Sequence, residues 1–393
     1  MFLRKIYPSL LNHLDKKPVT VLTGLRRVGK TTALKYLYAQ ARTENKIYID
    51  LERIENQMIF KQNSYRDIER ALELQGFDFH TEGVIAIDEI QNVKNCSSII
   101  KALYDDFGTK FILTGSSSFY LKNHFSESLA GRKKIFEMHP LDFEEFLLFK
   151  SIQIKTLHKE CMKPFLPAYY NKYKSLYEEY IQYGGFPDVV LAEHEAEKND
   201  YLKDIINSHI ELDIKLLGDI SSSDALYKLI FLLAHRVGSK VDYSKIANNL
   251  GINRNKVKEY ILLLEHTYLI RTIKPFTKGI DKEITKQSKI YFSDLGILQA
   301  CGQHSSGAIF ENQIANQLYL KGELNYYEKS SGTEIDFILD KKTAIEVKET
   351  PTESDFNTLK RRAKPLEMEE HILIGRKPAP SEYYNFIWGG NIF

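Results

Sequence analysis

The sequence predicts an α/β protein that begins with a parallel sheet covered by helices. Residues 19–23 form a short β-branched run, followed by a glycine-containing loop and a helical pattern. Residues 83–87 are an apolar run that ends in two acids, and residues 110–114 are another short apolar run. Short buried runs that alternate with helical patterns are typical of parallel sheets in α/β proteins.

The loop at residues 24–32, GLRRVGKTT, fits the phosphate-binding pattern G-x-x-x-x-G-K-[ST]. Gly24 and Gly29 let backbone N–H groups surround an anion at the N-terminus of the next helix. Lys30 can reach the β- and γ-phosphates of a nucleotide, and the hydroxyl of Thr31 can bind Mg²⁺. The predicted nucleotide contacts of this loop are Gly24, Arg26, Arg27, Gly29, Lys30, Thr31 and Thr32.

Two acids, Asp88 and Glu89, end the second apolar run. Ligands bind at the carboxyl ends of the strands of an open α/β sheet. We therefore expect Asp88 to hold Mg²⁺ and Glu89 to act as the general base for the attacking water. A core strand that ends in an acidic turn is the simpler alternative, but the phosphate-binding loop upstream favours the catalytic interpretation.

Polar residues after the next strands are further candidates. Ser116 is predicted to sense the γ-phosphate, although a serine-rich turn explains residues 115–118 equally well. Arg132 is a candidate arginine finger, acting across a subunit boundary. A solvated or ion-paired arginine is the alternative, and Arg26 and Arg27 compete for the same role.

Length and composition limit the functional classes. A chain of 393 residues predicts two or three domains, and 43% hydrophobic with 27% charged residues is ordinary for a globular protein. The net charge of +2 indicates no partner, and the three scattered cysteines predict neither a disulfide framework nor a zinc site. No apolar run approaches the length needed to span a membrane, so we expect a cytoplasmic protein without membrane contact.

The middle of the chain predicts a helical lid and then a winged helix-turn-helix. Residues 141–220 have helical spacing interrupted by Gly184-Gly185-Phe186-Pro187, and their aromatic residues are predicted to be core. A short helix then ends at Leu250, Gly251 and Asn253 form a turn, a longer helix covers 254–266, and residues 268–273 form a strand.

Basic residues concentrate in this region. Residues 240–289 contain 11 Lys and Arg against 5 Asp and Glu. Four polar or basic residues lie where a recognition helix meets nucleic acid: Arg254, Asn255, Lys256 and Lys258. Concentrated positive charge favours binding of a phosphate backbone. The alternative is a winged helix that serves only as a lid or a protein contact.

Two strands near the C-terminus carry a possible second metal site. Residues 333–339 and 343–348 predict a hairpin that places Asp336 beside Glu346. Glu346 and Lys348 are two residues apart and therefore share one face of a strand. The carboxylates can bind Mg²⁺, Lys348 can orient water or neutralise phosphate, and Glu311 on the preceding helix can complete the site. Surface acids on amphipathic strands are the alternative.

The motifs GLRRVGKTT, AIDEIQNV, LTGSSSFYL, SLAGR and MHPLDFEEF together resemble bacterial and archaeal AAA-type ATPases (AAA_14-like) with a C-terminal DUF4143-like region. The resemblance implies ATP as the nucleotide and an additional-strand sheet, in which the sensor strand lies between the strands of the phosphate-binding loop and of Asp88. The end of the chain resembles the PD-(D/E)xK nuclease superfamily, a restriction-endonuclease-like α/β fold. Ile335 stands where that motif has proline.

These observations predict four domains: an ATPase core at 1–140, a helical lid at 141–220, a winged helix at 221–285 and a nuclease-like domain at 286–393. The expected function is a Mg²⁺-dependent ATPase that couples ATP binding and hydrolysis to DNA binding, with metal-dependent DNA cleavage as a further activity. The first alternative is a nucleotide switch that binds nucleic acid or protein without cutting. The second is a protein-remodelling ATPase. Arg132 as a finger in trans would require a homo-oligomer with an ATPase–ATPase interface.

Overall fold

The computed structural model describes residues 2–62, 64–115, 129–152, 162–214, 223–277, 287–329, 332–380 and 382–392. The chain divides into two compact units. Unit 1 comprises Met1–His139, Glu211–Asp219 and His266–Tyr268, and unit 2 comprises Pro140–Ile210, Ile220–Glu265 and Leu269–Phe393. Within the described residues, none of the helices combines the length and the apolar character that crossing a bilayer requires.

Unit 1 is built on five parallel strands in the order β2-β3-β4-β1-β5. The strands are β1 (Val19–Gly24), β2 (Lys46–Asp50), β3 (Val84–Asp88), β4 (Lys110–Gly115) and β5 (Lys133–Met138). β4 lies between β1, which leads into the phosphate-binding loop, and β3, which ends at Asp88. This order confirms the predicted additional-strand sheet. Parallel strands place all their carboxyl ends at one edge, so the predicted nucleotide residues gather there.

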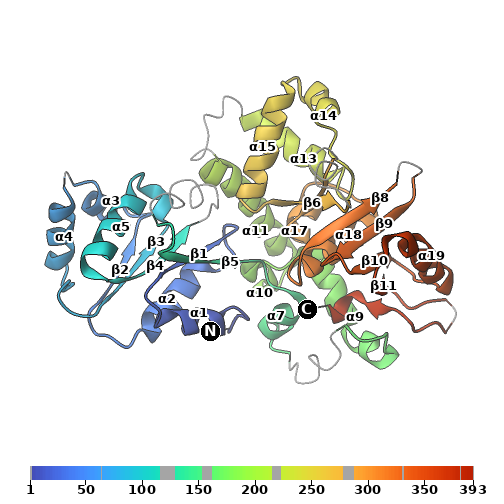
Figure 1. Ribbon diagram of the computed structural model, residues 1–393, viewed down its shortest axis with the longest axis horizontal. Coiled ribbons are helices and arrows are strands. Elements are labelled where there is room, and N and C mark those ends of the chain that lie inside the picture. The colour runs from blue at the N-terminus through green and yellow to red at the C-terminus, as the bar shows by residue number, and fades with distance from the viewer. Residues whose placement is uncertain are drawn as a thin grey trace. The chain divides into compact units, whose positions relative to one another are not determined.

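Helices cover both faces of this sheet (Figure 1). They are α1 (Tyr7–Leu14), α2 (Lys30–Gln40), α3 (Ile54–Phe60), α4 (Tyr65–Leu74) and α5 (Cys96–Phe107), with a 3₁₀ turn at Ile90–Asn92. α1 and α2 pack on one face, where His13 hydrogen-bonds Thr20. α3, α4 and α5 enclose an apolar core on the other face.

Unit 2 combines helices with a second sheet. Its helices are α7 (Phe143–Phe149), α9 (Pro167–Tyr183), α10 (Pro187–Leu191), α11 (Glu195–Ser208), α13 (Ser223–Ala234), α14 (Tyr243–Leu250), α15 (Arg254–His266), α17 (Leu295–Ala300), α18 (Ser306–Tyr319) and α19 (Glu353–Ala363). Short turns of other helix types cover His209–Ile214, Lys364–Leu366 and Gly389–Asn391.

The predicted helix–turn–helix is present as α14, a turn and α15. The side chain of Asp242 caps α14 by accepting from the backbone N–H groups of Ser244 and Lys245. Gly251 ends α14 with φ of 65°, a left-handed conformation that favours glycine. Asn253 starts α15 by accepting from the N–H of Lys256 at 2.7 Å. Local capping residues therefore fix these helix boundaries.

The sheet of unit 2 has seven strands in the order β12-β11-β10-β9-β8-β6-β7. They are β6 (Ile270–Pro275), β7 (Lys289–Phe292), β8 (Leu324–Glu328), β9 (Glu334–Leu339), β10 (Thr343–Lys348), β11 (Glu370–Gly375) and β12 (Ile387–Trp388). β6 pairs antiparallel with β7 and parallel with β8. The strand predicted at 268–273 begins two residues later, at Ile270. Tyr268 has φ of 65°, which is not an extended conformation. The proposed domain boundary at 285/286 separates β6 from both of its partners in this sheet.

The Gly184-Gly185 pair is explained by contacts with Asp294. A Cβ atom at Gly184 would lie 2.1 Å from Asp294 Oδ1, and one at Gly185 would lie 2.2 Å from the carbonyl oxygen of Leu141. The Gly185 N–H donates to Asp294 Oδ2 at 2.7 Å, and the Gly296 N–H donates to Oδ1 at 2.8 Å. Burial raises the pKa of Asp294 to about 6. The hydrogen bonds from these backbone donors act in the opposite direction and lower it.

Aromatic residues of the predicted lid are core residues, as expected. The indole of Trp388 is buried among the rings of Phe143, Tyr170 and Tyr177, with centroids 6.3, 5.4 and 5.1 Å away. Its Nε1 donates to the carbonyl of Arg376 at 3.1 Å. Trp388 is therefore a packing residue of unit 2. This cluster joins the helices before the helix–turn–helix to the C-terminal sheet within unit 2.

Candidate functional site

The phosphate-binding loop has the backbone geometry that its glycines indicate. Gly24 has φ of 140°, and a Cβ atom there would lie 2.1 Å from the carbonyl oxygen of Met138. Gly29 has φ of 95° and stands immediately before α2. Side chains at either position would strain the backbone, and at Gly24 one would also displace β5. The loop is therefore held open at the N-terminus of α2, a favourable place for an anion.

Lys30 lies inside the loop. Its side chain is buried, and Nζ donates to the carbonyl oxygens of Gly24 at 3.1 Å and Leu25 at 3.0 Å. Thr31 follows as a partly buried residue, and Thr32 is exposed. The ammonium is thus positioned within the loop by backbone contacts that phosphate oxygens can replace.

The two arginines of the loop have different surroundings. Arg26 forms an ion pair with Glu52 at 3.0 Å. Arg27 is exposed and has φ of 63°, an uncommon backbone conformation for a residue other than glycine. Either guanidinium lies on the loop itself, so both stay candidates for phosphate contact.

Asp88 is held at the end of β3 by two hydroxyl groups. Its side chain is buried, with the Tyr48 hydroxyl donating to Oδ2 at 3.0 Å and the Thr114 hydroxyl donating to Oδ1. Hydrogen bonds to a carboxylate are among the stronger ones in proteins. Asp88 is thus an oriented carboxylate at the same edge of the sheet as Lys30, which is the position expected of a residue that holds Mg²⁺.

Glu89 follows in a left-handed backbone conformation with φ of 54°. Its N–H donates to Thr114 Oγ1 at 3.0 Å, and Gln91 donates to its carboxylate. Burial raises the pKa of the Glu89 carboxyl, while the charge of Lys30 and the hydrogen bond from Gln91 oppose that rise. A carboxylate with a raised pKa is a better proton acceptor, which is what a general base requires.

Thr114 is a functional candidate that sequence reasoning missed. One hydroxyl contacts both acids, because it donates to the Asp88 carboxylate and accepts from the Glu89 N–H. The available signal was a polar residue at the end of an otherwise apolar strand. Ser116, the predicted γ-phosphate sensor, lies outside the described residues.

Arg132 lies near the amino ends of the parallel strands, whereas the phosphate-binding loop lies at their carboxyl ends. The carbonyl oxygen of Arg132 accepts a hydrogen bond from the N–H of Val19, the first residue of β1. The phosphate-binding loop lies at the other end of β1, after its last residue. That separation is about 17 Å along the strand. The guanidinium donates to Asp105 Oδ1 at 2.7 Å. Arg132 therefore does not reach the phosphate site of its own unit, and the role of finger in trans stays a proposal.

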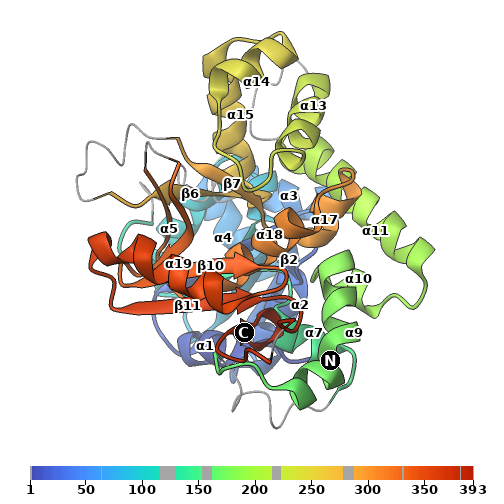
Figure 2. The same ribbon diagram turned by 90° about the vertical axis from the view of Figure 1, so that its right-hand side faces the viewer.

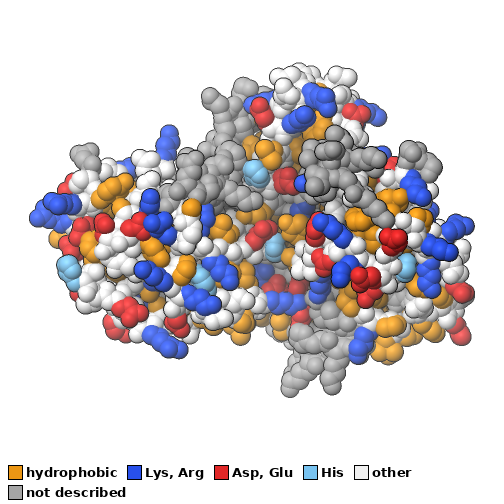
Figure 3. Space-filling model, in the orientation of Figure 1, with side chains coloured by type: hydrophobic (Ala, Val, Ile, Leu, Met, Phe, Trp, Pro, Cys, Tyr) orange, Lys and Arg blue, Asp and Glu red, His pale blue; other side chains and the backbone are white. Residues whose placement is uncertain are grey.

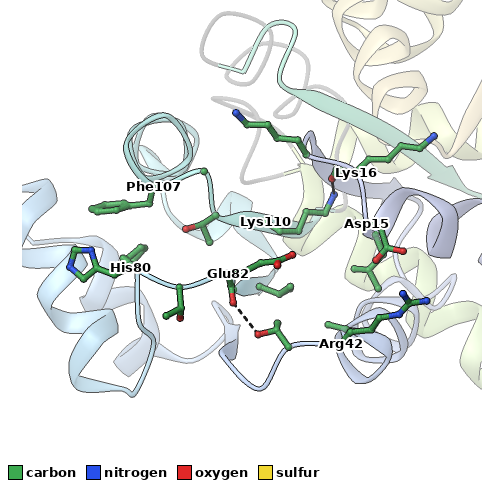
Figure 4. Close-up of a pocket in the computed structure, with 17 residues that line it drawn as sticks. Asp15, Lys16, Arg42, His80, Glu82, Phe107 and Lys110 are labelled. Carbon is green, nitrogen blue, oxygen red and sulfur yellow. Dashed lines mark hydrogen bonds between the residues drawn. The ribbon is translucent and has the colours of Figure 1, made fainter.

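A pocket of about 840 Å³ lies at that same far edge of unit 1 (Figure 4). The view shows Lys110, at the start of β4, together with Arg42 and Glu82 among the residues that line it. The Lys110 ammonium donates to the carbonyls of His13, Lys16 and Pro18 at 3.1, 2.7 and 2.6 Å. Because nucleotide ligands bind at the carboxyl ends of the strands, this pocket is separate from the phosphate-binding loop.

In unit 2, the predicted hairpin is formed by β9 and β10. It turns through Asp340 and Lys341, at φ of 50° and 61°. Ile345 pairs with Phe337, so the same register continues to Asp336 opposite Glu346. Lys348 Nζ donates to Glu346 Oε1 at 2.7 Å, which confirms that these two side chains share a face.

Glu346 is a buried carboxylate with unequal oxygens. Oε1 accepts from Lys348 and also from Arg362 Nη1 at 3.2 Å. Oε2 is buried, and no donor among the described residues reaches it. A buried oxygen without a partner is unfavourable, and a cation is one way to satisfy it.

Asp336 and Glu346 form a pair, and Glu311 is held elsewhere. Burial and the charges of Glu346 and Glu311 raise the pKa of Asp336 to about 8. Glu311 Oε1 accepts from the Tyr291 hydroxyl at 2.6 Å and contacts Lys289 Nζ at 3.4 Å. Over the described part of the chain, no three carboxylate, histidine or cysteine side chains converge as metal ligands. This differs from the predicted three-carboxylate set, because Tyr291 and Lys289 hold Glu311.

The remaining pair still fits a divalent ion. Mg²⁺ is commonly bound by one or two carboxylates, with water and substrate phosphates completing its shell. One buried oxygen of Glu346 has no donor among the described residues, and the charge of Glu346 contributes after burial to the raised pKa of Asp336, so the two carboxyl groups lie close together. Asp336 and Glu346 are therefore the residues that would hold such an ion.

The predicted nucleic-acid residues lie in the first turn and a half of α15. Arg254, Asn255 and Lys258 are exposed. Lys256 is partly buried, forms an ion pair with Glu259 at 3.1 Å and lies over the ring of Tyr260. Arg254 and Asn255 are thus exposed on this surface, and Lys258 is exposed there with its ammonium 5.8 Å from the centroid of the Tyr243 ring.

Family models match three consecutive segments of the chain. They are an AAA domain (AAA_14) at residues 16–147, a domain of unknown function (DUF8612) at residues 174–306 and another (DUF4143) at residues 306–387. The AAA match covers the five strands of the unit 1 sheet and every predicted nucleotide residue. The boundary near residue 306 coincides with the start of α18.

Similar proteins include an uncharacterized protein of Haemophilus influenzae, 28% identical over 88% of this chain and 87% of that protein. Uncharacterized protein MJ1637 of Methanocaldococcus jannaschii is 30% identical over 83% of this chain and 73% of its own length. Among solved structures, the Aeropyrum pernix ORC1 protein in complex with DNA aligns over 76% of this chain and 92% of that one, with a TM-score of 0.34 and 13% identity. This chain therefore belongs to the family of MJ1637, and it carries an AAA domain and a C-terminal DUF4143 region.

Proposed function

We propose that this protein is a Mg²⁺-dependent ATPase that couples ATP binding and hydrolysis to DNA binding. The observation that carries the proposal is the convergence of Lys30, Asp88 and Glu89 at one edge of the parallel sheet, with Thr114 bonded to both acids. These are the parts that phosphoryl transfer to water requires: a phosphate cradle, a metal carboxylate and a base.

Each residue has a distinct task in the proposed reaction. The loop N–H groups and Lys30 bind the β- and γ-phosphates and neutralise their charge. Thr31 and Asp88 would hold Mg²⁺, which supplies further charge neutralisation when bound. Glu89 orients the attacking water and accepts its proton. Thr114 fixes the relative positions of the two acids through its single hydroxyl group.

DNA binding is supported by the start of α15. Arg254 and Lys258 are exposed on the second helix of a helix–turn–helix, the element that contacts DNA in such motifs. On the face shown in Figure 3, Lys and Arg side chains are interspersed with Asp and Glu side chains. The support therefore comes from this helix and from the basic excess of residues 240–289 rather than from a broad basic surface.

Two paired measurements test this function. Lys30→Met should abolish ATP hydrolysis, because the methionine keeps the length of the side chain and removes the charge; Lys101→Met on α5 is the matched control. Unchanged hydrolysis by Lys30→Met would reject the ATPase site.

For DNA, the double variant Arg254→Ala/Lys258→Ala should bind duplex DNA more weakly and with a shallower dependence on salt. Lys203→Ala/Lys228→Ala, on exposed positions of α11 and α13, controls for the loss of two positive charges. Fluorescence anisotropy at several salt concentrations gives both quantities. Equal binding by the α15 variant and the control, or wild-type binding that does not respond to salt, would favour the protein-remodelling alternative.

Metal-dependent DNA cleavage is a second candidate function, favoured by the adjacent Asp336, Glu346 and Lys348 in unit 2. The order α18, β8, β9, β10, α19, β11 provides a mixed sheet with this hairpin at its centre. Cleavage of single- and double-stranded DNA should be measured with Mg²⁺ or Mn²⁺, with and without ATP. Asp336→Asn should remove the activity and the exposed Glu370→Gln should retain it. If the wild-type protein cleaves DNA in none of these conditions, the cleavage function is rejected. The alternative of a nucleotide switch that binds without cutting is then favoured.

A further inference from the structure

We propose that Arg362 is an internal counter-cation, which competes with a divalent cation for Glu346 and keeps metal binding at the Asp336–Glu346 pair weak. This inference rests on the second candidate function, because it concerns regulation of the same carboxylate pair. It adds a residue that lies outside the strand motif and on a different element, α19.

The position of Arg362 is fixed by two hydrogen bonds and by its helix. Its Nη1 donates to the carbonyl oxygen of Glu334 at 2.9 Å and to Glu346 Oε1 at 3.2 Å. α19 lies across β10 and β11 (Figure 2), with Leu359 and Ala363 fully buried on either side of Arg362 in the sequence. The helix and the two hydrogen bonds therefore hold the guanidinium beside Glu346 on β10.

The charges around Glu346 are arranged asymmetrically. Lys348 and Arg362 both contact Oε1, while Oε2 is buried without a partner. Only 5% of the Glu346 side chain is exposed, against 36% for Lys348 and 32% for Arg362. The carboxylate is thus neutralised from one side, and its other oxygen is left for a further cation.

A divalent cation at Oε2 would lie close to two fixed positive charges. Their repulsion is strong in a partly buried site, where screening is weaker than in water. Removing the guanidinium removes one of these charges and leaves Asp336 and both oxygens of Glu346 in place. Metal affinity should therefore rise when Arg362 is replaced by a neutral residue.

The Arg362 side chain is 32% exposed to solvent. Arginine pairs with phosphate in a bidentate geometry, as it does with carboxylate. A phosphodiester that drew Arg362 away from Glu346 would free the carboxylate for metal. Phosphate and metal binding at this site would then assist each other, since such coupling is reciprocal.

The test is Mn²⁺ binding to the full-length, nucleotide-free protein, measured by the electron paramagnetic resonance signal of free Mn²⁺. Asp336→Asn identifies the sites that belong to unit 2. Arg362→Gln should bind Mn²⁺ about tenfold more tightly at those sites, the size expected for one nearby charge. Lys360→Gln is the matched control, because Lys360 lies on the same helix over the Phe356 ring and should leave the affinity unchanged. Arg362→Lys keeps the charge and should stay close to wild type.

Each outcome has a separate meaning. Equal or weaker Mn²⁺ binding by Arg362→Gln, with binding still lost in Asp336→Asn, overturns the role of Arg362 and leaves the metal site intact. Tightening by Arg362→Lys or Lys360→Gln equal to that of Arg362→Gln also overturns it. If Asp336→Asn binds Mn²⁺ as the wild type does, the carboxylate pair is not a metal site. That outcome would reject both the metal site and the cleavage function. If Arg362→Gln does not fold, Lys348→Gln removes the other cation on Oε1 and should tighten binding in the same direction.

Discussion

Replacing Thr114 by valine removes one hydroxyl group and keeps the shape of the side chain. Thr114 is completely buried, donates to the Asp88 carboxylate and accepts from the Glu89 N–H at 3.0 Å. The variant loses a hydrogen bond to a charged group and leaves a buried N–H without its acceptor. Together these losses should destabilise unit 1 by about 2–5 kcal/mol. Asp88 keeps its bond from Tyr48, so the site should lose its alignment without losing both acids.

The functional consequence should be a lower turnover number with little change in ATP affinity. The loop and Lys30 are untouched, so nucleotide binding persists, whereas the base and the metal carboxylate are misplaced. We expect kcat to fall about 10- to 100-fold, because small errors in the position of catalytic groups have effects of this size.

Thr20→Val is the matched control for this prediction. Thr20 is equally buried in the same sheet and hydrogen-bonds His13 at 2.8 Å, at the far end of β1 from the loop. That substitution should lower stability by about 0.5–1.5 kcal/mol and leave kcat unchanged. Steady-state hydrolysis, titration with a fluorescent ATP analogue and urea unfolding measure the three quantities. Wild-type turnover by a folded Thr114→Val protein would refute the role assigned to this hydroxyl.

Two further substitutions test the fold around the sites. Asp294 has a pKa of about 6 in the folded protein, above the ordinary value of about 4, so the folded state binds the additional proton between these pH values. The unfolding free energy should therefore fall by up to about 3 kcal/mol as pH rises from 4 to 6, and Asp294→Asn should flatten this dependence in urea titrations. Gly24→Ala places a methyl group 2.1 Å from the Met138 carbonyl oxygen; it should weaken ATP binding and lower the thermal midpoint, whereas an unchanged midpoint would contradict the loop geometry.

The fold of unit 1 was largely predictable because its signals are local. The phosphate-binding loop requires glycines at fixed positions, and buried parallel strands are recognisable as short apolar runs. The strand order followed from the family resemblance rather than from any single pattern. α3 and α5 were not predicted, although both contribute to an apolar core of this unit.

The contacts that were missed depend on residues distant in the sequence. Thr114 looks like any threonine at the end of a strand until β4 is placed beside β3. Arg362 is one of several basic residues on α19, and only the folding of that helix onto β10 brings it to Glu346. Glu311 was assigned to the metal site from its position on the preceding helix, but Tyr291 and Lys289 hold its carboxylate.

Glu89 provides the most direct test of the proposed hydrolysis. Glu89→Gln preserves the size of the side chain and removes its capacity to accept a proton. Single-turnover hydrolysis of radiolabelled ATP by this variant should be at least about 100-fold slower than by the wild type, while ATP affinity stays similar. A variant that binds ATP and hydrolyses it at the wild-type rate would contradict the assignment of Glu89 as the base, and with it the proposed mechanism.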